Sequence, residues 1–343
     1  MDQSPPADRR ARSTTLLNFS LAIGGAVLLL LTVRRVGWSD VQAGLGQVGW
    51  WFVLILILGG LRFTARARAW MVSAAGVMDA SGPEPQASTG PLRTLDFLGA
   101  VLAADALGNV TPLGLLASEP AKILLVRGRL PTLAAISSVA IENACYIASV
   151  VAMLLAGAIV FVNLTNLPAG LQLAVEVVFV GATLAAMGAV VVARRKPALL
   201  SRLAHMLSAL TGRGATSGER LAEVERQFYG MLRWRASRLT HVLAWEALFH
   251  VAAVAEVYLV MQLLPVAGET SLADAFVLET TGRLIAVVFK FVPYRLGVDE
   301  AGTAIVASAL AIDPAAGVAL ALIRRTRILC WNSVGLIVLA RSR

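Results

Sequence analysis

The segment Lys290-Phe-Val-Pro-Tyr-Arg-Leu-Gly-Val-Asp-Glu300 sets a proline break and four charged side chains inside an otherwise apolar region. Hydrophobic sequence leads up to it from Leu272 and continues beyond it to Ile312. A charge at the centre of a membrane helix costs about 2.5–3.5 kcal/mol on insertion scales, so such a segment persists only where protein or a watery cavity covers it. We therefore take residues 290–300 as the predicted functional centre.

The composition of the chain is that of a membrane protein. Of 343 residues, 57% are hydrophobic and 15% are charged, and the mean hydropathy is +0.74. These values lie outside the range of soluble proteins, and several apolar runs reach the roughly 18–20 residues that span a bilayer core. The fold class expected is an all-α polytopic membrane protein.

The net charge of +9 does not indicate nucleic-acid binding, because the basic residues flank hydrophobic segments. That distribution is typical of positive-inside topology and of contact with anionic lipid head groups. Cys145 and Cys330 fall in apolar helices without metal-ligand spacing, so we expect neither a disulfide, nor a metal site, nor any other cofactor. The oligomeric state is not predicted.

Charge and hydropathy together give a topology with six spans. Residues 1–14 form a polar, disordered cytoplasmic tail, and residues 15–343 form a single transmembrane domain. The loops at 163–170 and 265–271 contain no Lys or Arg, which places them outside and both termini in the cytoplasm. The predicted spans are residues 15–33, 48–70, 133–162, 171–193, 240–264 and 315–339, and a cytoplasmic loop is expected over residues 77–93.

A basic connector, residues 194–238, separates two halves of the chain. Apolar residues recur at helical spacing over 199–210 and again over 221–232, which predicts two amphipathic helices. They either lie on anionic lipid or form a solvated link. Both interpretations stay open at this point.

Two apolar segments, residues 95–126 and 272–312, are broken in the middle by Pro and Gly. Each half is too short to span a bilayer alone, so each segment is predicted to be a re-entrant helical hairpin. Pro112 precedes Glu119 by seven residues, and Pro293 precedes Glu300 by seven. Together with the topology, this spacing predicts two inverted repeats, repeat A (residues 48–162) and repeat B (residues 240–339).

The second hairpin carries a charged helical face. Glu279, Arg283 and Lys290 are spaced four and seven residues apart and share that face. They either pair among themselves or form a basic lining for an anionic head group. In the first repeat, Arg62 and Arg66 share a face and act either as a cytoplasmic anchor or as a contact for lipid phosphate.

Acidic residues are predicted at the start of each second half-helix. Ser118-Glu119-Pro120 and Asp299-Glu300 either cap the helices or act as counter-charges near the midplane. Glu142 could pair with Arg324 or Arg325 across the bundle, and Glu246 with His250 four residues on. The predicted structural breaks are Pro112, Pro293 and Gly297. The predicted substrate-binding residues are Arg62, Asn109, Glu119, Glu142, Glu279, Arg283, Lys290, Arg295, Asp299, Glu300 and Arg325.

Several motifs resemble a known family. They are the stretch from Arg62 to Trp70, the Gly108-Asn-Val-Thr-Pro and Ser118-Glu-Pro segments, Glu142, and Phe289-Lys-Phe-Val-Pro-Tyr-Arg-Leu-Gly-Val-Asp-Glu-Ala-Gly302. They resemble the flippase-like domain named after the membrane part of lysylphosphatidylglycerol synthase, and most closely its hopanoid-biosynthesis-associated (HpnL-type) branch. The resemblance covers about residues 16–340. It implies a bacterial inner-membrane protein that moves or handles a lipid.

The function expected is therefore a lipid translocase that moves an anionic phospholipid, polyprenyl or hopanoid-related lipid through a cavity between the repeats. The alternative is an accessory protein that binds an enzyme of hopanoid or glycolipid synthesis. The chain ends at Arg343 without the aminoacyl-transfer domain of the full synthase, and it has no nucleophile elbow, Walker loop or metalloprotease motif. We therefore expect no enzymatic activity and no catalytic residue; an integral-membrane transferase is the weakest alternative.

Overall fold

The structure is a computed structural model that describes residues 46, 48–81, 92–110, 114–164, 169–195, 216–231, 234, 236–289, 292 and 295–341. Within these residues the protein is entirely helical, with ten α-helices, one 3-10 turn and no strand. The helices are α3 (Trp51–Ser81), α4 (Thr94–Val110), α5 (Gly114–Leu125), α6 (Thr132–Leu164), α7 (Ala169–Arg195), α9 (Thr216–Gly230), α10 (Ala236–Leu263), α11 (Leu272–Val288), α12 (Val298–Ala309) and α13 (Pro314–Arg341), with the turn η2 (Pro265–Ala267) after α10.

Most predicted helices are present at the predicted places. Five of the six predicted spans are the long helices α3, α6, α7, α10 and α13, while the first span and the N-terminal tail lie outside the described residues. Both hairpin segments are split near their prolines, into α4 and α5 and into α11 and α12. The connector contains α9 where the second amphipathic helix was expected; residues 199–210 lie outside the described part.

The prediction of a loop over residues 77–93 was wrong at its start, because α3 continues to Ser81. Val77 is buried against Ala134 and Ile141 of α6, together with partly buried side chains around α9. This tertiary contact supplies an apolar partner for the last turns of α3, so the helix extends past the point where the charge pattern indicated the membrane edge.

Two described helices, α6 and α10, are long and apolar enough to cross a membrane by length and composition. α3 and α13 are of similar length, at 31 and 28 residues, but each carries three arginines in its middle region. Such charges need partners inside the protein. The arrangement of the helices around these arginines therefore determines where polar groups gather.

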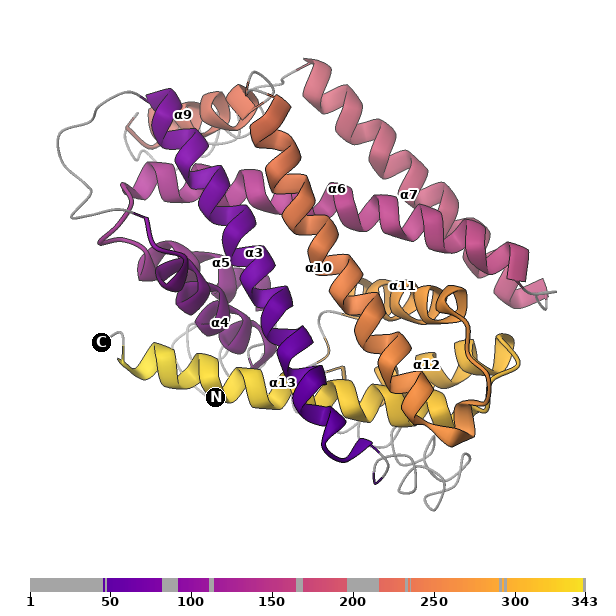
Figure 1. Ribbon diagram of the computed structural model, residues 1–343. Helices are drawn as coiled ribbons and strands as arrows, with labels where there is room; N and C mark the ends of the chain where they lie inside the picture. Colours follow the sequence, from indigo (N-terminus) through magenta and orange to yellow (C-terminus); the bar gives the residue numbers. More distant parts are fainter. Residues whose placement is uncertain are drawn as a thin grey trace, which may run out of the picture.

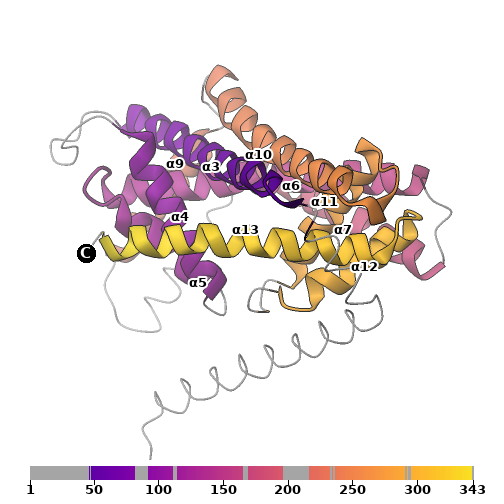
Figure 2. The same cartoon turned by 60° about the horizontal axis from the view of Figure 1, so that its bottom comes forward.

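Helices α3 and α10 lie side by side and run in opposite directions through the centre of the molecule (Figure 1). Arg238 at the start of α10 pairs with Asp79 at the end of α3 at 2.5 Å. α6 and α13 each contact both helices of this pair. The pair α4–α5 lies at one end of the molecule and α11–α12 at the other, in both views (Figures 1 and 2).

Small residues allow the helices to approach closely. Gly59 and Gly60 of α3 lie against the ring of Trp331 on α13, whose indole N–H donates to the carbonyl of Leu56 at 3.2 Å. Gly335 of α13 leaves room only for the backbone of Leu102 on α4. Close packing at small residues is the usual way for helices to associate in a membrane.

Apolar side chains form two main cores, one in each half of the molecule. Trp70 and Phe97 anchor the core of α3 and α4, with their rings edge to face at 4.8 Å. Val257, Leu278 and Leu320 belong to the core of α10, α11 and α13. Between these two cores lie the charged groups described next.

Candidate functional site

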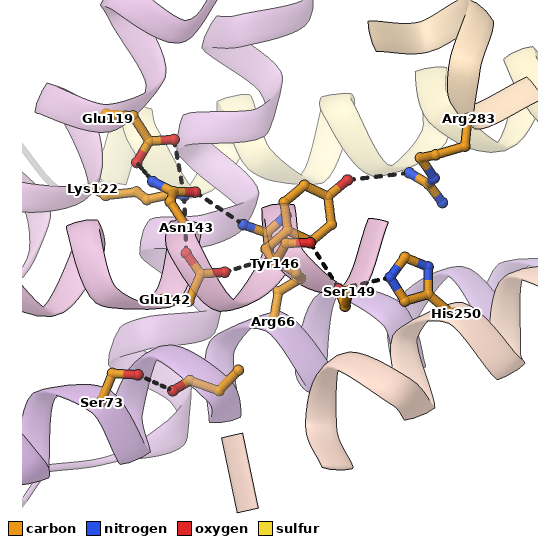
Figure 3. Close-up of polar contacts among 11 residues, drawn as sticks. Arg66, Ser73, Glu119, Lys122, Glu142, Asn143, Tyr146, Ser149, His250 and Arg283 are labelled. Atoms are coloured by element: carbon orange, nitrogen blue, oxygen red, sulfur yellow. Dashed lines mark hydrogen bonds and ion pairs between the residues drawn. The ribbon is translucent and has the colours of Figure 1, made fainter. Parts of the chain in front are cut away.

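Three arginines meet two aromatic rings where the two halves of the chain join. The guanidinium carbons of Arg62, Arg66 and Arg283 lie 4.9, 5.9 and 5.0 Å from the centroid of the Phe249 ring. Arg66 also lies over the ring of Tyr146 at 3.9 Å (Figure 3). We name this group, with the neighbouring His250, the arginine–aromatic cluster: Arg62 and Arg66 of α3, Tyr146 of α6, Phe249 and His250 of α10, and Arg283 of α11.

Local sequence positions each of these side chains. The four-residue spacing of Arg62 and Arg66 puts both on the face of α3 that packs against α10. Phe249 packs edge to face against Tyr146 at 5.7 Å between ring centroids. Arg283 reaches the cluster from α11 and donates to the hydroxyl of Tyr146 at 3.4 Å (Figure 3).

Each arginine of the cluster already has a carboxylate partner. All three partners are glutamates with at most 2% of their surface exposed. The pairs are Arg62–Glu256 at 2.9 Å, Arg66–Glu142 at 2.5 Å and Arg283–Glu279 at 2.6 Å. Three like charges gathered around one ring would repel each other, and these glutamates offset that repulsion.

The arginines of α13 bind the same layer of acids from the other side. Arg327 lies 2.8 Å from Glu256, and Arg324 contacts Glu279. Glu256 and Glu279 therefore each lie between two arginines of different helices. The third arginine of α13, Arg325, pairs with Glu300 of α12. α13 is thus tied by charge to α10, α11 and α12.

A separate polar chain runs from the cluster into the first hairpin. Arg66 donates to the side-chain oxygen of Asn143 at 3.4 Å, and Asn143 donates to Glu119 at 3.0 Å (Figure 3). Lys122 lies 3.2 Å from Glu119 and 3.9 Å from Glu142. The two acids and two cations thus form one network that links α3, α5 and α6.

The second hairpin contains the acidic cap that the sequence predicted. α12 begins at Val298, and Glu300 accepts from the backbone N–H of Gly297 at 2.8 Å. Arg295 has a left-handed backbone with φ of 49° and pairs with Asp299 at 3.1 Å. The predicted site residue Lys290 and the break at Pro293 lie outside the described residues.

The capping role predicted for Glu119 and Pro120 was wrong. α5 begins at Gly114, so both residues lie inside the helix and not in its first turn. Glu119 is instead bound by Lys122 one turn on. The reason is that the chain re-enters helix directly after the break around Pro112, a residue that itself lies outside the described part.

Asn109, another predicted site residue, lies at the contact of the first hairpin with α13. Its amide nitrogen donates to Asp105 at 3.0 Å and to the side-chain oxygen of Asn332 at 3.2 Å. Asp105 is accessible to solvent, yet Arg66, Lys122 and Arg327 from three other helices act on it electrostatically. Asp105 therefore gives the charged interior a solvent-accessible acidic neighbour.

Two predicted pairings were wrong. Glu142 does not meet Arg324 or Arg325, because Arg66 on the neighbouring α3 occupies it. His250 does not pair with Glu246; its Nε2 lies 2.9 Å from the hydroxyl of Ser149 on α6 (Figure 3). The pairing of Glu279 with Arg283 was among the predicted alternatives and is present.

The predicted substrate-binding residues left out several members of the interior, although most of these gave a signal in the sequence. Arg66, Glu256, Arg324 and Arg327 are charges at membrane depth, and that property alone marks them as interior groups. Tyr146 and Phe249 gave no such signal, because aromatic residues in apolar helices are usually packing residues. Their place beside arginines follows only from the packing of α6 on α10.

The chemistry of this interior favours an anionic ligand. Guanidinium groups donate in a planar fork that matches phosphate and carboxylate oxygens, and they stack on aromatic faces. The described residues contain no group of three or more metal-ligating side chains. Guanidinium groups arranged in this way can bind a phosphate-like group.

Comparison with known proteins agrees with a membrane lipid function. No curated protein and no solved structure matches the chain. The model of the family described as "Lysylphosphatidylglycerol synthase TM region" matches residues 17–331, which include the arginine–aromatic cluster and most of α13. The chain therefore belongs to the lysylphosphatidylglycerol synthase transmembrane-region family of membrane proteins.

Proposed function

We propose that this protein is a lipid translocase that moves a lipid with an anionic head group from one leaflet to the other. The observation that carries the proposal is the arginine–aromatic cluster, in which three guanidinium groups from α3 and α11 converge on Phe249. Membership in a family related to lipid synthesis or transport favours a lipid as the ligand. The bacterial inner membrane, with both termini in the cytoplasm, is the location we infer for it.

The arrangement of the helices supports an inverted repeat. α3 of the first repeat packs antiparallel to its counterpart in the second repeat, α10. α4 of the first repeat packs on α13 of the second. In the same way, the counterpart of α4, α11, packs on α6 of the first repeat. The half-helix pairs α4–α5 and α11–α12 also correspond. In transporters with inverted repeats, the binding site lies at the interface of the repeats and access alternates between the two sides. The arginine–aromatic cluster occupies that interface, and we infer that both hairpins are re-entrant.

In the proposed translocase, the glutamates around the cluster exchange with the lipid phosphate on the arginines. A buried ion pair is costly to desolvate and contributes little net stability. A phosphate that enters the cluster displaces the glutamates from Arg66 and Arg283, and the glutamates take the arginines back when the lipid leaves. The Arg66–Glu142 and Arg283–Glu279 pairs are thus resting contacts of the site.

The test is lipid movement in liposomes that contain the purified protein. Fluorescent phosphatidylglycerol is placed in both leaflets, and a membrane-impermeant quencher reports the fraction that reaches the outside. Loss of a hydrogen bond to a charged group costs about 1.5–3 kcal/mol, so Arg283→Ala should slow movement by roughly ten- to a hundredfold. Arg66→Ala should do the same.

Arg129→Ala is the matched control, because Arg129 also pairs with a carboxylate, Asp96, but is 32% exposed and distant in sequence from the cluster. Movement at the uncatalysed rate with the wild-type protein would contradict the translocase. The accessory-protein alternative would then gain support if an enzyme of lipid synthesis co-purified and was lost on deletion of residues 199–237. The identity of the lipid, hopanoid-related or not, is read from the lipids that co-purify.

A further inference from the structure

Glu246 of α10 is buried without a hydrogen-bond or ion-pair partner in the described part of the chain. None of its surface is exposed, and neither carboxyl oxygen has a hydrogen bond or ion pair to any described residue. The three other glutamates with no exposed surface among the described residues, Glu256, Glu279 and Glu300, each have an arginine at contact distance. Glu246 differs from all of them.

The groups that face Glu246 come from four helices. α3 contributes Arg66, α5 contributes Lys122, and α6 contributes Glu142, with Cys145 and Tyr146 beside it. On its own helix, His250 follows four residues later and is bound to Ser149. Arg283 of α11 and Arg327 of α13 face α10 further along, at His250 and Glu256.

Both cations near Glu246 are already engaged with other acids. Arg66 lies 2.5 Å from Glu142, and Lys122 lies 3.2 Å from Glu119 and 3.9 Å from Glu142. Arg66 thus acts electrostatically on both Glu142 and Glu246, and in this conformation it is paired with Glu142. A buried carboxylate without such a partner is far more costly than a neutral carboxylic acid.

We propose that Glu246 is a proton-binding site, which carries a proton in this conformation and releases it when Arg66 moves from Glu142 to Glu246. In that exchange Glu246–COOH and Glu142–COO⁻ become Glu246–COO⁻ and Glu142–COOH, so one proton moves opposite to one guanidinium. Glu142 connects through Lys122 to Glu119, whose side chain is 24% exposed and gives the proton a way to water.

The consequence for lipid movement rests on the proposed translocase function. A phosphate that draws Arg66 away from Glu142 changes which acid holds the proton, so head-group binding and proton binding are linked. Lipid movement then depends on pH through Glu246. The site itself does not need that function, because its burial and its missing partner are properties of the resting protein.

The first experiment tests the proton directly. Infrared spectra of the full-length protein in an ester-free detergent at neutral pH should contain the carbonyl band of a protonated, buried carboxylic acid that shifts in deuterium oxide. Glu246→Gln should remove this band, whereas Glu256→Gln should leave it. A spectrum without the band, or a band that persists in the Glu246→Gln protein, would overturn the proposal.

Thermal unfolding of the same proteins separates the proton site from a structural ion pair. An amide replaces a protonated carboxyl with little change in shape or charge, so Glu246→Gln should keep the wild-type melting temperature. Glu256→Gln leaves Arg62 and Arg327 facing a neutral side chain and should melt several degrees lower. An equal loss in both variants would mean that Glu246 is ionised and paired, against the proposal.

The second experiment tests the link to lipid movement. The rate of phosphatidylglycerol movement in liposomes should change with pH for the wild-type protein and should become independent of pH for Glu246→Gln. If no protein moves lipid, the translocase function fails while the infrared result still decides the proton site. If lipid moves with the same pH dependence in both proteins, the link through Glu246 is wrong.

Discussion

The two segments proposed as repeats, A (residues 48–162) and B (residues 240–339), carry opposite charges on their last helices. In repeat B the last helix, α13, supplies three arginines, and the acids come from α10, α11 and α12. In repeat A the last helix, α6, supplies the acid Glu142, and the cations come from α3 and α5. A similar helix arrangement therefore holds two different polar interiors.

This difference indicates that the repeats do not contribute equally to stability. Three acids of repeat B, Glu256, Glu279 and Glu300, have no exposed surface and are each held by two arginines or by an arginine and a backbone N–H. Repeat A contains the accessible Asp105, and its Arg66 acts on Glu246 of repeat B, which has no hydrogen-bond partner among the described residues. We expect the acids bound by α13 to form the rigid part of the polar interior and the surroundings of Arg66 to form the part in which charges are exchanged.

The largest loss of stability should come from removing Glu256, the acid that pairs with arginines of both α3 and α13. Glu256→Ala leaves Arg62 and Arg327 buried without their carboxylate, which should cost about 3–5 kcal/mol of unfolding free energy. The measurement is denaturant or thermal unfolding in detergent. The control Glu223→Ala removes the pair with the exposed Arg226 and should change stability by about 1 kcal/mol or less.

The equivalent change in repeat A should be milder. Glu142→Ala removes the partner of Arg66, but the Arg66 side chain is 17% exposed and retains Asn143. We expect a loss of about 3 kcal/mol or less, the lower end of the range for a broken buried pair. A loss of unfolding free energy greater than that of Glu256→Ala would contradict the expectation that the acids bound by α13 form the rigid part of the interior.

Substitution of two glycines at contacts between the repeats should have effects of intermediate size. A Cβ on Gly335 of α13 meets the backbone of Leu102, which cannot turn aside, so Gly335→Ala should cost about 1–3 kcal/mol by overpacking. A Cβ on Gly157 of α6 meets only the side chain of Thr280. Gly157→Ala should therefore be rescued by Thr280→Ala, whereas Leu102→Ala should not rescue Gly335→Ala. Gly128, with open space around it, is the neutral control.

The smallest effect is expected at the second hairpin. Arg295 and Asp299 are 20% and 22% exposed, so Arg295→Ala should lower the unfolding free energy by about 1 kcal/mol or less, and less at high salt. Unfolding at two salt concentrations measures this. A salt-independent loss of several kcal/mol would show that this pair belongs to the rigid interior of repeat B.

The sequence predicted the long helices and the two broken segments, because apolar length, proline and glycine act locally. It also placed Arg62, Glu142, Glu279 and Arg283 in the interior, because a charged side chain at membrane depth must be surrounded by protein or water. It did not predict their partners. Which acid meets Arg66 depends on the rotation of α3 against α6, and that rotation is set by packing between segments far apart in the chain.

The substrate-binding role predicted for these residues stays a prediction, and the same holds for Lys290. Glu246 illustrates the limit most clearly, since hydropathy and spacing paired it with His250. The packing of α6 instead places the hydroxyl of Ser149 next to His250, while Glu246 has no hydrogen-bond partner among the described residues. The absence of a partner is a property of the assembled interior and has no local pattern.

Helix α7 determines at which end of the molecule α10 begins. It packs mainly on α6 and leaves many apolar side chains exposed, among them Leu173, Val177 and Leu184. The end of α6 lies beside the end of α10, where Phe161 joins the core of Val260 and Leu264. α7 carries the chain back so that α10 can start at the opposite end. In the inverted-repeat topology proposed above, this return is what makes the second repeat run opposite to the first.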